Sequence, residues 1–232
     1  MKIGLIGAGR LGICLALLIE QEGYHVIASD VREDYIKDLQ NKKINSTEPQ
    51  VQELLEHSIN LEFTTDNRKV IRESDIIFTL VQTPSLEDGS YDVSAVWKVV
   101  EDIKQEMSSI ANYPKSFVVG CTTNPGDCDQ FKDALPESVD VYYNPEFIAQ
   151  GSIVDDLRHA DMVLLGGDGQ HSGALEMIYY QIQNGFKAAN VSTMSTRAAE
   201  LTKIAVNCFL TTKITYANQV GQVMIRDGME DE

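Results

Sequence analysis

The sequence predicts an α/β protein built on a doubly wound, mostly parallel Rossmann sheet, followed by one long helix. Three observations support this. Short β-rich runs alternate with longer helical stretches, several of the runs are continuously apolar, and a glycine-rich turn follows the first one. A chain of 232 residues with 43% hydrophobic content can bury a sizeable core.

The expected strands are short runs rich in apolar and β-branched residues. They are Lys2–Ile6, His25–Ser29, Asp75–Val81, Ser116–Cys121, Val141–Tyr143 and Met162–Leu165, with weaker signals at Leu61–Phe63 and Phe186–Val191. The helices expected between them are Leu11–Glu22, Glu33–Asn41, Val51–Glu56, Val93–Met107, Gly126–Ala134 and Ala174–Gln183.

The pattern changes after Met194. Ser195–Arg226 contains no proline, and its apolar positions recur at helical spacing, with Ser195 and Thr196 as N-cap candidates. The sequence predicts one helix about 45 Å long. We therefore expect an NAD-binding domain over residues 1–192. Residues 193–232 are then the start of a second domain whose remainder is absent, either because the chain is a fragment or because it is a natural short form.

Composition limits the partners. A formal charge of −16 disfavours nucleic acid and anionic membranes, but not a small anionic ligand. The N-terminus lacks a signal-peptide pattern, and no apolar run reaches the length of a membrane span. Four cysteines without metal-binding spacing predict reduced thiols in the cytoplasm and no metal site.

The first turn predicts a dinucleotide site. Gly7, Gly9 and Gly12, with Arg10 and Leu11 between them, form a GxGxxG pattern that follows a strand and opens a helix. The pyrophosphate is expected at that helix N-terminus. Asp30 ends the second strand, where a carboxylate binds the ribose hydroxyls and repels a 2′-phosphate, so NAD is favoured over NADP. Arg32, close by, weakens that preference.

Further motifs follow later strands, and the last lies on the long helix. They are LVQTP at 80–84, CTTNPG at 121–126, YNPEFIAQGS at 143–152 and ELTKIAVN at 200–207. Together with the glycine turn, and in this order, they resemble the UDP-glucose/GDP-mannose dehydrogenase family along the whole chain. Such enzymes oxidise a sugar C6 alcohol to a carboxylate in two NAD-dependent steps, through a thiohemiacetal and a thioester on a cysteine.

The resemblance assigns roles to individual residues. It places Thr83 and Thr122 at the cofactor, and it places Thr122 and Glu146 beside the reacting carbon of a nucleotide sugar, most simply a UDP-sugar. Glu146 then acts as a base on the water that hydrolyses the thioester. Lys203 and Asn207 hold the substrate oxygen and a water.

Elementary chemistry agrees with part of this assignment. A hydride leaves an alcohol only when the hydroxyl proton is removed and the developing charge on oxygen is stabilised, and a lysine serves either need. Lys203 and Asn207 are four residues apart, hence on one helix face. The plainer interpretations are a solvated helix face for this pair, a buried hydrogen-bonded acid for Glu146 and a helix cap for Thr122.

Two departures from the family limit the comparison. Gln150 stands where the family often has a second glutamate, and no GGxCxPKD-like motif with the catalytic cysteine occurs. We therefore expect this chain alone not to oxidise a nucleotide sugar. Two alternatives stay open: a one-step β-hydroxyacid-type dehydrogenase, against which the NPEF segment argues, and a non-catalytic NAD-binding or dimerisation module. The long apolar stripe of Ser195–Arg226 predicts a homodimer.

Overall fold

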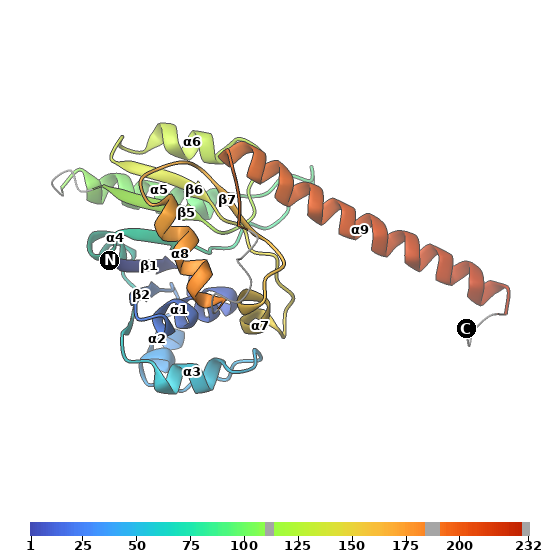
Figure 1. The fold of residues 1–232 in the computed structure, drawn as a ribbon, viewed down its shortest axis with the longest axis horizontal. Helices are drawn as coiled ribbons and strands as arrows, with labels where there is room; N and C mark the ends of the chain where they lie inside the picture. The colour runs from blue at the N-terminus through green and yellow to red at the C-terminus, as the bar shows by residue number, and fades with distance from the viewer. Residues whose placement is uncertain (110–113, 184–190, 229–232) are drawn as a thin grey trace.

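The computed structural model describes residues 1–109, 114–183 and 191–228. In this part of the chain, a single sheet with the strand order β3-β2-β1-β4-β5-β6-β7-β8 separates two layers of helices, and α9 projects away from them (Figure 1). Every strand pairing is parallel except that of β6 with β7. The predicted doubly wound, mostly parallel Rossmann sheet followed by a long helix is confirmed.

The strands are short and largely buried, as expected for a sheet covered on both faces. They are β1 (Lys2–Ile6), β2 (His25–Ser29), β3 (Leu61–Thr64), β4 (Ile76–Thr79), β5 (Lys115–Val119), β6 (Val139–Tyr143), β7 (Val163–Gly166) and β8 (Val191–Met194). The helices are α1 (Arg10–Gln21), α2 (Glu33–Gln40), α3 (Val51–His57), α4 (Asn67–Glu73), α5 (Ser94–Met107), α6 (Asp127–Ala134), α7 (Ile153–Arg158), α8 (Ser172–Ile182) and α9 (Thr196–Arg226).

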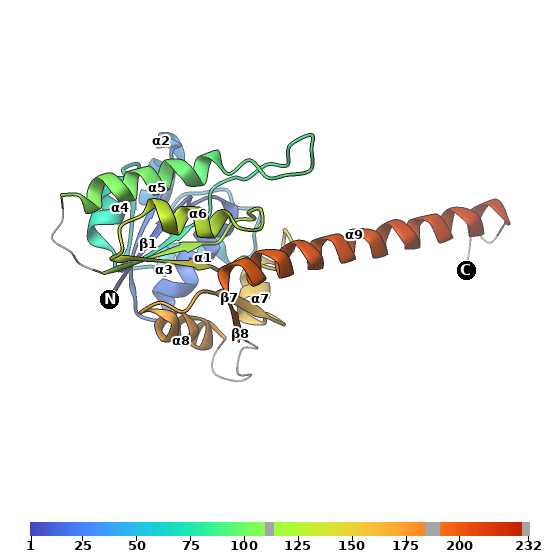
Figure 2. The same cartoon turned by 90° about the horizontal axis from the view of Figure 1, so that it is seen from above.

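The two faces of the sheet carry separate hydrophobic cores. Figure 2 shows α4, α5 and α6 on one face and α1, α7 and α8 on the other. The core below α5 and α6 contains Val100, Phe117 and Phe131, whereas the core around α1 contains Leu15, Phe78 and Tyr179. Nearly all of α1 is buried, because it packs against the sheet as well as α7 and α8.

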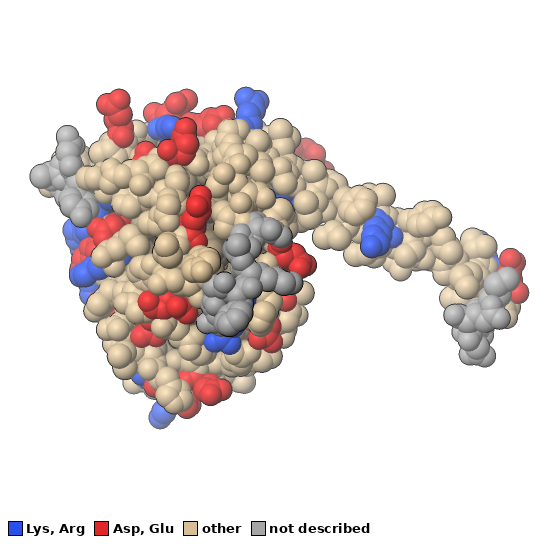
Figure 3. All heavy atoms as spheres, in the orientation of Figure 1, with Lys and Arg blue, Asp and Glu red and all other residues tan. Residues whose placement is uncertain are grey.

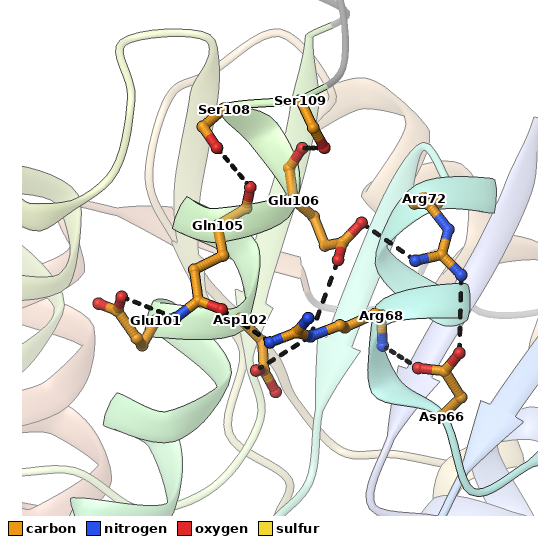
Figure 4. A network of polar contacts seen from close by, with 9 residues as sticks. All are labelled: Asp66, Arg68, Arg72, Glu101, Asp102, Gln105, Glu106, Ser108 and Ser109. Atoms are coloured by element: carbon orange, nitrogen blue, oxygen red, sulfur yellow. Dashed lines mark hydrogen bonds and ion pairs between the residues drawn. The ribbon is translucent and has the colours of Figure 1, made fainter.

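An ion-pair network joins α4 to α5 at the surface (Figure 4). Arg72 Nη1 donates to Glu106 Oε2 at 3.1 Å, and Arg68 lies 3.8 Å from Glu106 and 3.9 Å from Asp102. Asp66 caps α4 by accepting a hydrogen bond from the Arg68 N–H. These contacts support a seven-residue helix that has few apolar positions of its own.

Most predicted elements appear with boundaries shifted by a few residues. The prediction omitted α4 and α7, which have seven and six residues. The weak strand signal at Phe186–Val191 lies almost entirely outside the described residues; β8 begins at Val191. The division of the chain after residue 192 stays a prediction.

The long helix has the predicted extent. It runs for 31 residues from Thr196, and the Ser195 side chain caps it by accepting a 3.3 Å hydrogen bond from the Ala198 N–H. Within the described residues, no helix is long and apolar enough to cross a membrane. Acidic side chains are spread over the visible face of the body, while α9 shows few charges (Figure 3).

Candidate functional site

A cavity of about 620 Å³ opens where the strand order reverses, between β1 and β4. Residues that follow these two strands line it, together with the end of β2 and the start of α5. This is the position at which doubly wound sheets bind ligands. The lining residues are Ile6, Gly7, Gly9, Arg10, Ser29, Asp30, Val31, Arg32, Asn67, Leu80, Val81, Gln82, Ala95, Lys98 and Val99.

The glycine turn leaves space for a ligand close to the backbone. Gly7 has a φ of +100°, and a Cβ there would lie 2.6 Å from the Leu80 carbonyl oxygen. A Cβ at Gly12 would lie 2.1 Å from the Gly7 oxygen, whereas one at Gly9 would meet no atom within 4 Å. No side chain caps the start of α1, so its first N–H groups are left for an anion.

Asp30 lies at the end of β2 on the cavity wall, with Arg32 bound to both of its oxygens. Arg32 Nε donates to Oδ1 at 2.8 Å and Arg32 Nη2 donates to Oδ2 at 2.9 Å. Burial alone raises the pKa of the Asp30 carboxyl, but the hydrogen bonds and charge of Arg32 outweigh burial and lower it. Asp30 is therefore an anion at neutral pH, as binding to ribose hydroxyls requires.

Gln150, the departure from the family pattern, lies beside the glycine turn. Its Oε1 accepts a 2.6 Å hydrogen bond from Arg10 Nη1 across 140 residues of sequence. Arg10 also lines the cavity. The amide in place of a carboxylate thus leaves Arg10 bound to a neutral partner, and its positive charge is not cancelled there.

Glu146 and Lys203, two of the predicted catalytic residues, meet at the end of β6. Lys203 Nζ donates a 2.7 Å hydrogen bond to the main-chain oxygen of Glu146 and lies 4.3 Å from the ring centre of Phe147. Burial raises the pKa of Glu146 to about 7, and the hydrogen bond between Glu146 and Tyr179 and the charge of Lys203 oppose this shift. Burial also lowers the pKa of Lys203, against the charge of Glu146. Both groups can exchange protons more readily near neutrality than their exposed counterparts can.

Thr122, Asn207, Thr83 and Leu11 are the remaining predicted residues. Thr122 follows β5, and Asn207 lies one turn beyond Lys203 on α9. Within the described residues, no hydrogen bond joins the side chain of either to Glu146. Thr83 and Leu11 lie next to lining residues of the cavity without lining it. The roles of all the predicted site residues stay predictions.

Sequence reasoning missed three residues of this centre. Asn144 and Tyr179 bind each other beside Glu146, and Glu200, an acidic residue of the ELTKIAVN motif, is fully buried. Asn144 belongs to the NPEF segment, so the motif could have indicated it. The sequence pattern does not indicate Tyr179, because an aromatic residue on an amphipathic helix is expected to be a core residue.

Similarity to known proteins agrees with this geometry. Residues 1–183 match the NAD-binding domain of the UDP-glucose/GDP-mannose dehydrogenase family. The chain belongs to this family. UDP-glucose 6-dehydrogenase TuaD of Bacillus subtilis is 28% identical over 99% of this chain and 50% of its own length. An uncharacterized protein of Methanocaldococcus jannaschii is 32% identical over 96% of this chain and 25% of its own length.

Solved structures of the family show the same fold. GDP-mannose dehydrogenase from Pseudomonas aeruginosa superposes with a TM-score of 0.87 at 25% identity, covering 98% of this chain and 54% of that one. UDP-glucose dehydrogenase from Pyrobaculum islandicum gives 0.85 at 26% identity, covering 95% and 52%. This chain therefore spans about half the length of these dehydrogenases. It is homologous to NAD-dependent nucleotide-sugar dehydrogenases over their N-terminal half.

Proposed function

We propose that this chain is the cofactor-binding half of an NAD-dependent dehydrogenase that oxidises the C6 alcohol of a nucleotide sugar, a UDP-sugar in the first instance, to a carboxylate. The contact between Lys203 and the NPEF segment carries the proposal. Lys203 Nζ bonds to the main-chain oxygen of Glu146, which holds the amine next to a residue whose carboxyl group has a raised pKa. Membership of the family supports the same chemistry.

The cavity fits NAD. The glycine turn and the start of α1 would hold the pyrophosphate, with Arg10 beside it, and Asp30 would bind the adenosine ribose. NAD, when bound, accepts the hydride. The 620 Å³ volume and the open space at Gly9 are both features of this chain that the cofactor requires.

The other steps of the reaction are assigned to four of the predicted residues. Lys203 removes the hydroxyl proton or stabilises the developing negative oxygen, and its lowered pKa suits either task. Asn207, on the same helix face, holds the substrate oxygen or a water. Thr122 orients substrate and cofactor at the end of β5, and Glu146 acts as the base on water in the hydrolytic step.

Three of the four cysteines of the chain do not suit a covalent step. Burial raises the pKa of the Cys14 and Cys121 thiols to about 12 and raises that of Cys128 further, the opposite of an activated thiolate. We accordingly expect the thiohemiacetal and thioester to form on a cysteine outside this chain. All four cysteines are free, in keeping with the reducing cytoplasm as the proposed location.

A homodimer through α9 is part of the proposal. Between 204 and 226 the helix has only two charged residues, Lys213 and Arg226. Its large apolar side chains are exposed in a single chain: Leu201, Phe209, Leu210, Ile214, Tyr216, Val220, Val223 and Ile225. A surface of this length and composition is unusual on a monomer, and a second copy of α9 would cover it.

The experiment is NADH formation by the protein from its complete reading frame, with a panel of UDP- and GDP-sugars. We expect turnover with a nucleotide sugar, reduced at least a hundredfold by Lys203→Ala, and no dependence on Lys213, whose replacement by alanine is the control. Turnover of a small β-hydroxyacid instead would support the one-step dehydrogenase. NAD binding without turnover of any substrate would support a non-catalytic module.

A further inference from the structure

The hydroxyl group of Tyr179 lies between two oxygen acceptors. Its Oη is 2.5 Å from Asn144 Oδ1 and 2.6 Å from Glu146 Oε1. Asn144 and Glu146 follow β6, whereas Tyr179 comes from α8 on one face of the sheet. Asn144 and Tyr179 are buried, so water cannot readily take part in this arrangement.

The orientation of the Asn144 amide follows from its other contact. Asn144 Nδ2 donates a 3.0 Å hydrogen bond to the main-chain oxygen of Leu164 on β7. The opposite orientation would bring Asn144 Oδ1 against that oxygen, two acceptors in contact. Asn144 therefore presents an oxygen, not an N–H group, to Tyr179.

A count of the available hydrogens then decides whether Glu146 is protonated or ionised. A neutral tyrosine has one hydrogen to donate, but its hydroxyl has two short oxygen contacts. When Glu146 is protonated, its carboxyl donates to Tyr179 Oη and Tyr179 donates to Asn144. When Glu146 is ionised, Tyr179 must turn its hydrogen to the carboxylate, and Asn144 Oδ1 faces a lone pair at short range. Only the protonated state satisfies both contacts.

The charged neighbours do not reverse this result. Lys203 from α9 and Tyr179 from α8 are the titratable groups that interact with Glu146 in the described chain. Lys203 Nζ bonds to the main-chain oxygen of Glu146 rather than to its carboxyl group. The pKa of Glu146, raised by burial to about 7, agrees with the hydrogen count.

We propose that Tyr179 is a positioning residue that keeps Glu146 protonated at rest by donating its own hydrogen to Asn144, and that its hydroxyl turns to Glu146 when the carboxyl loses its proton. The chain of hydrogen bonds runs from Glu146 through Tyr179 and Asn144 to the main-chain oxygen of Leu164. Because an amide and a main-chain carbonyl do not pass protons on, Glu146 cannot lose its proton along this chain. Glu146 is only partly buried, so it must exchange its proton with a molecule on its exposed side. That this molecule is substrate or water rests on the proposed function; the hydrogen count does not.

The test is a titration of Glu146 in this chain, followed by the infrared band of its protonated carboxyl and assigned by its absence in Glu146→Gln. We expect the wild-type band to persist to near-neutral pH. Asn144→Ala removes the acceptor that competes for the Tyr179 hydrogen, so the carboxyl should lose about tenfold in proton affinity, equivalent to one pKa unit. In a Tyr179→Phe background, Asn144→Ala should not change the proton affinity of Glu146, because Asn144 and Glu146 are coupled only through the Tyr179 hydroxyl. Tyr180→Phe, its exposed neighbour, is the control.

Three outcomes would overturn the proposal. The first is a wild-type Glu146 that titrates near its ordinary value of 4.5. The second is an Asn144→Ala variant in which the proton affinity of Glu146 is unchanged, and the third is an equal change in that affinity with and without the Tyr179 hydroxyl. Should Asn144→Ala fail to fold, Asn144→Leu takes its place, because leucine is close to asparagine in size and also removes the acceptor. No substrate is present in these measurements, so failure of the proposed enzyme activity is a separate result.

Discussion

Glu200, in the first turns of α9, accepts a 2.6 Å hydrogen bond from the backbone N–H of Gly126 at the start of α6. Its other oxygen accepts bonds from the Cys128 N–H at 2.9 Å and the Thr123 hydroxyl at 3.0 Å. A fully buried carboxylate thus caps α6 from another helix and fixes the base of α9 on the sheet. Lys203 lies on the same buried face, so this anchor also positions it against Glu146.

Glu200→Gln tests this anchor. The amide retains the shape of the side chain, but in either orientation its N–H₂ group faces a backbone N–H, that of Gly126 or that of Cys128. We therefore expect a loss of about 2–3 kcal/mol in the free energy of unfolding. Urea denaturation measures it. Glu176→Gln on the exposed side of α8 is the matched control and should change stability by less than about 0.5 kcal/mol. An equal effect of the two substitutions would contradict the anchoring role.

The Asp30–Arg32 pair predicts cofactor choice. We expect at least tenfold tighter binding of NAD than of NADP, about 1.4 kcal/mol, because the Asp30 carboxylate repels a 2′-phosphate. Asp30→Ala should abolish this preference, since it removes the repulsion and frees Arg32 to bind the phosphate. Calorimetric titration with both cofactors measures this, with Asp34→Ala on α2 as control. Equal affinities in the wild type would refute the assignment of Asp30.

Glu146 predicts an unusual pH dependence of stability. Its folded pKa of about 7 is above its ordinary value of 4.5, so between these values the folded state binds more protons than the unfolded state. The stabilisation is complete below pH 4.5 and is lost as the pH rises through 7, with a magnitude of about 3 kcal/mol.

Glu146→Gln should remove this part of the pH dependence, because the amide donates to Tyr179 as the protonated acid does and does not ionise. The measurement is the free energy of unfolding of wild type minus variant across pH 4 to 8. A difference that does not change with pH would show that the carboxyl titrates alike in both states.

The sequence allowed prediction of what depends on local pattern. The glycine turn between β1 and α1, the buried strands and the helical period of α9 each depend on a few neighbouring residues, and the structure contains all three. The role of the turn at a cofactor stays a prediction. The environment of Glu146 depends on Tyr179, which comes from α8 and packs against the loop after β6 only in the folded sheet. Glu200 has the spacing of a solvated helix face, and only the approach of α6 makes it a buried cap. Long-range packing of this kind is not encoded in local spacing.

The backbone at Gln50 is strained, in the turn between α2 and α3. Its φ is +67°, in the left-handed region, where a side chain costs about 1 kcal/mol relative to glycine. The side chain also donates to Asp155 and accepts from Arg158 on α7. Both Gln50→Gly and Gln50→Ala lose these bonds, but only glycine relieves the strain. We therefore expect the glycine variant to be more stable than the alanine variant by about 1 kcal/mol in urea denaturation.

The matched control is Asp38, which is exposed and helical in α2. There the order should reverse, because glycine destabilises a helix interior by about 1 kcal/mol relative to alanine. The same order at both positions would show that the backbone at Gln50 is not strained.

The last prediction concerns the apolar surface of α9. Phe209 and Ile214 are 68% and 61% exposed, and burying each against a second chain would contribute about 1.5–3 kcal/mol. We expect a homodimer in sedimentation at micromolar concentration, converted to monomers by replacing both residues with aspartate, because charge opposes burial in an apolar contact. NAD binding should survive, since neither residue lines the cofactor cavity. Met177→Asp with Tyr180→Asp on α8 is the matched control: it also replaces two exposed apolar side chains, and it should leave the dimer intact. A wild-type chain that sediments as a monomer, or a control pair that dissociates the dimer equally, would exclude α9 as the contact between copies.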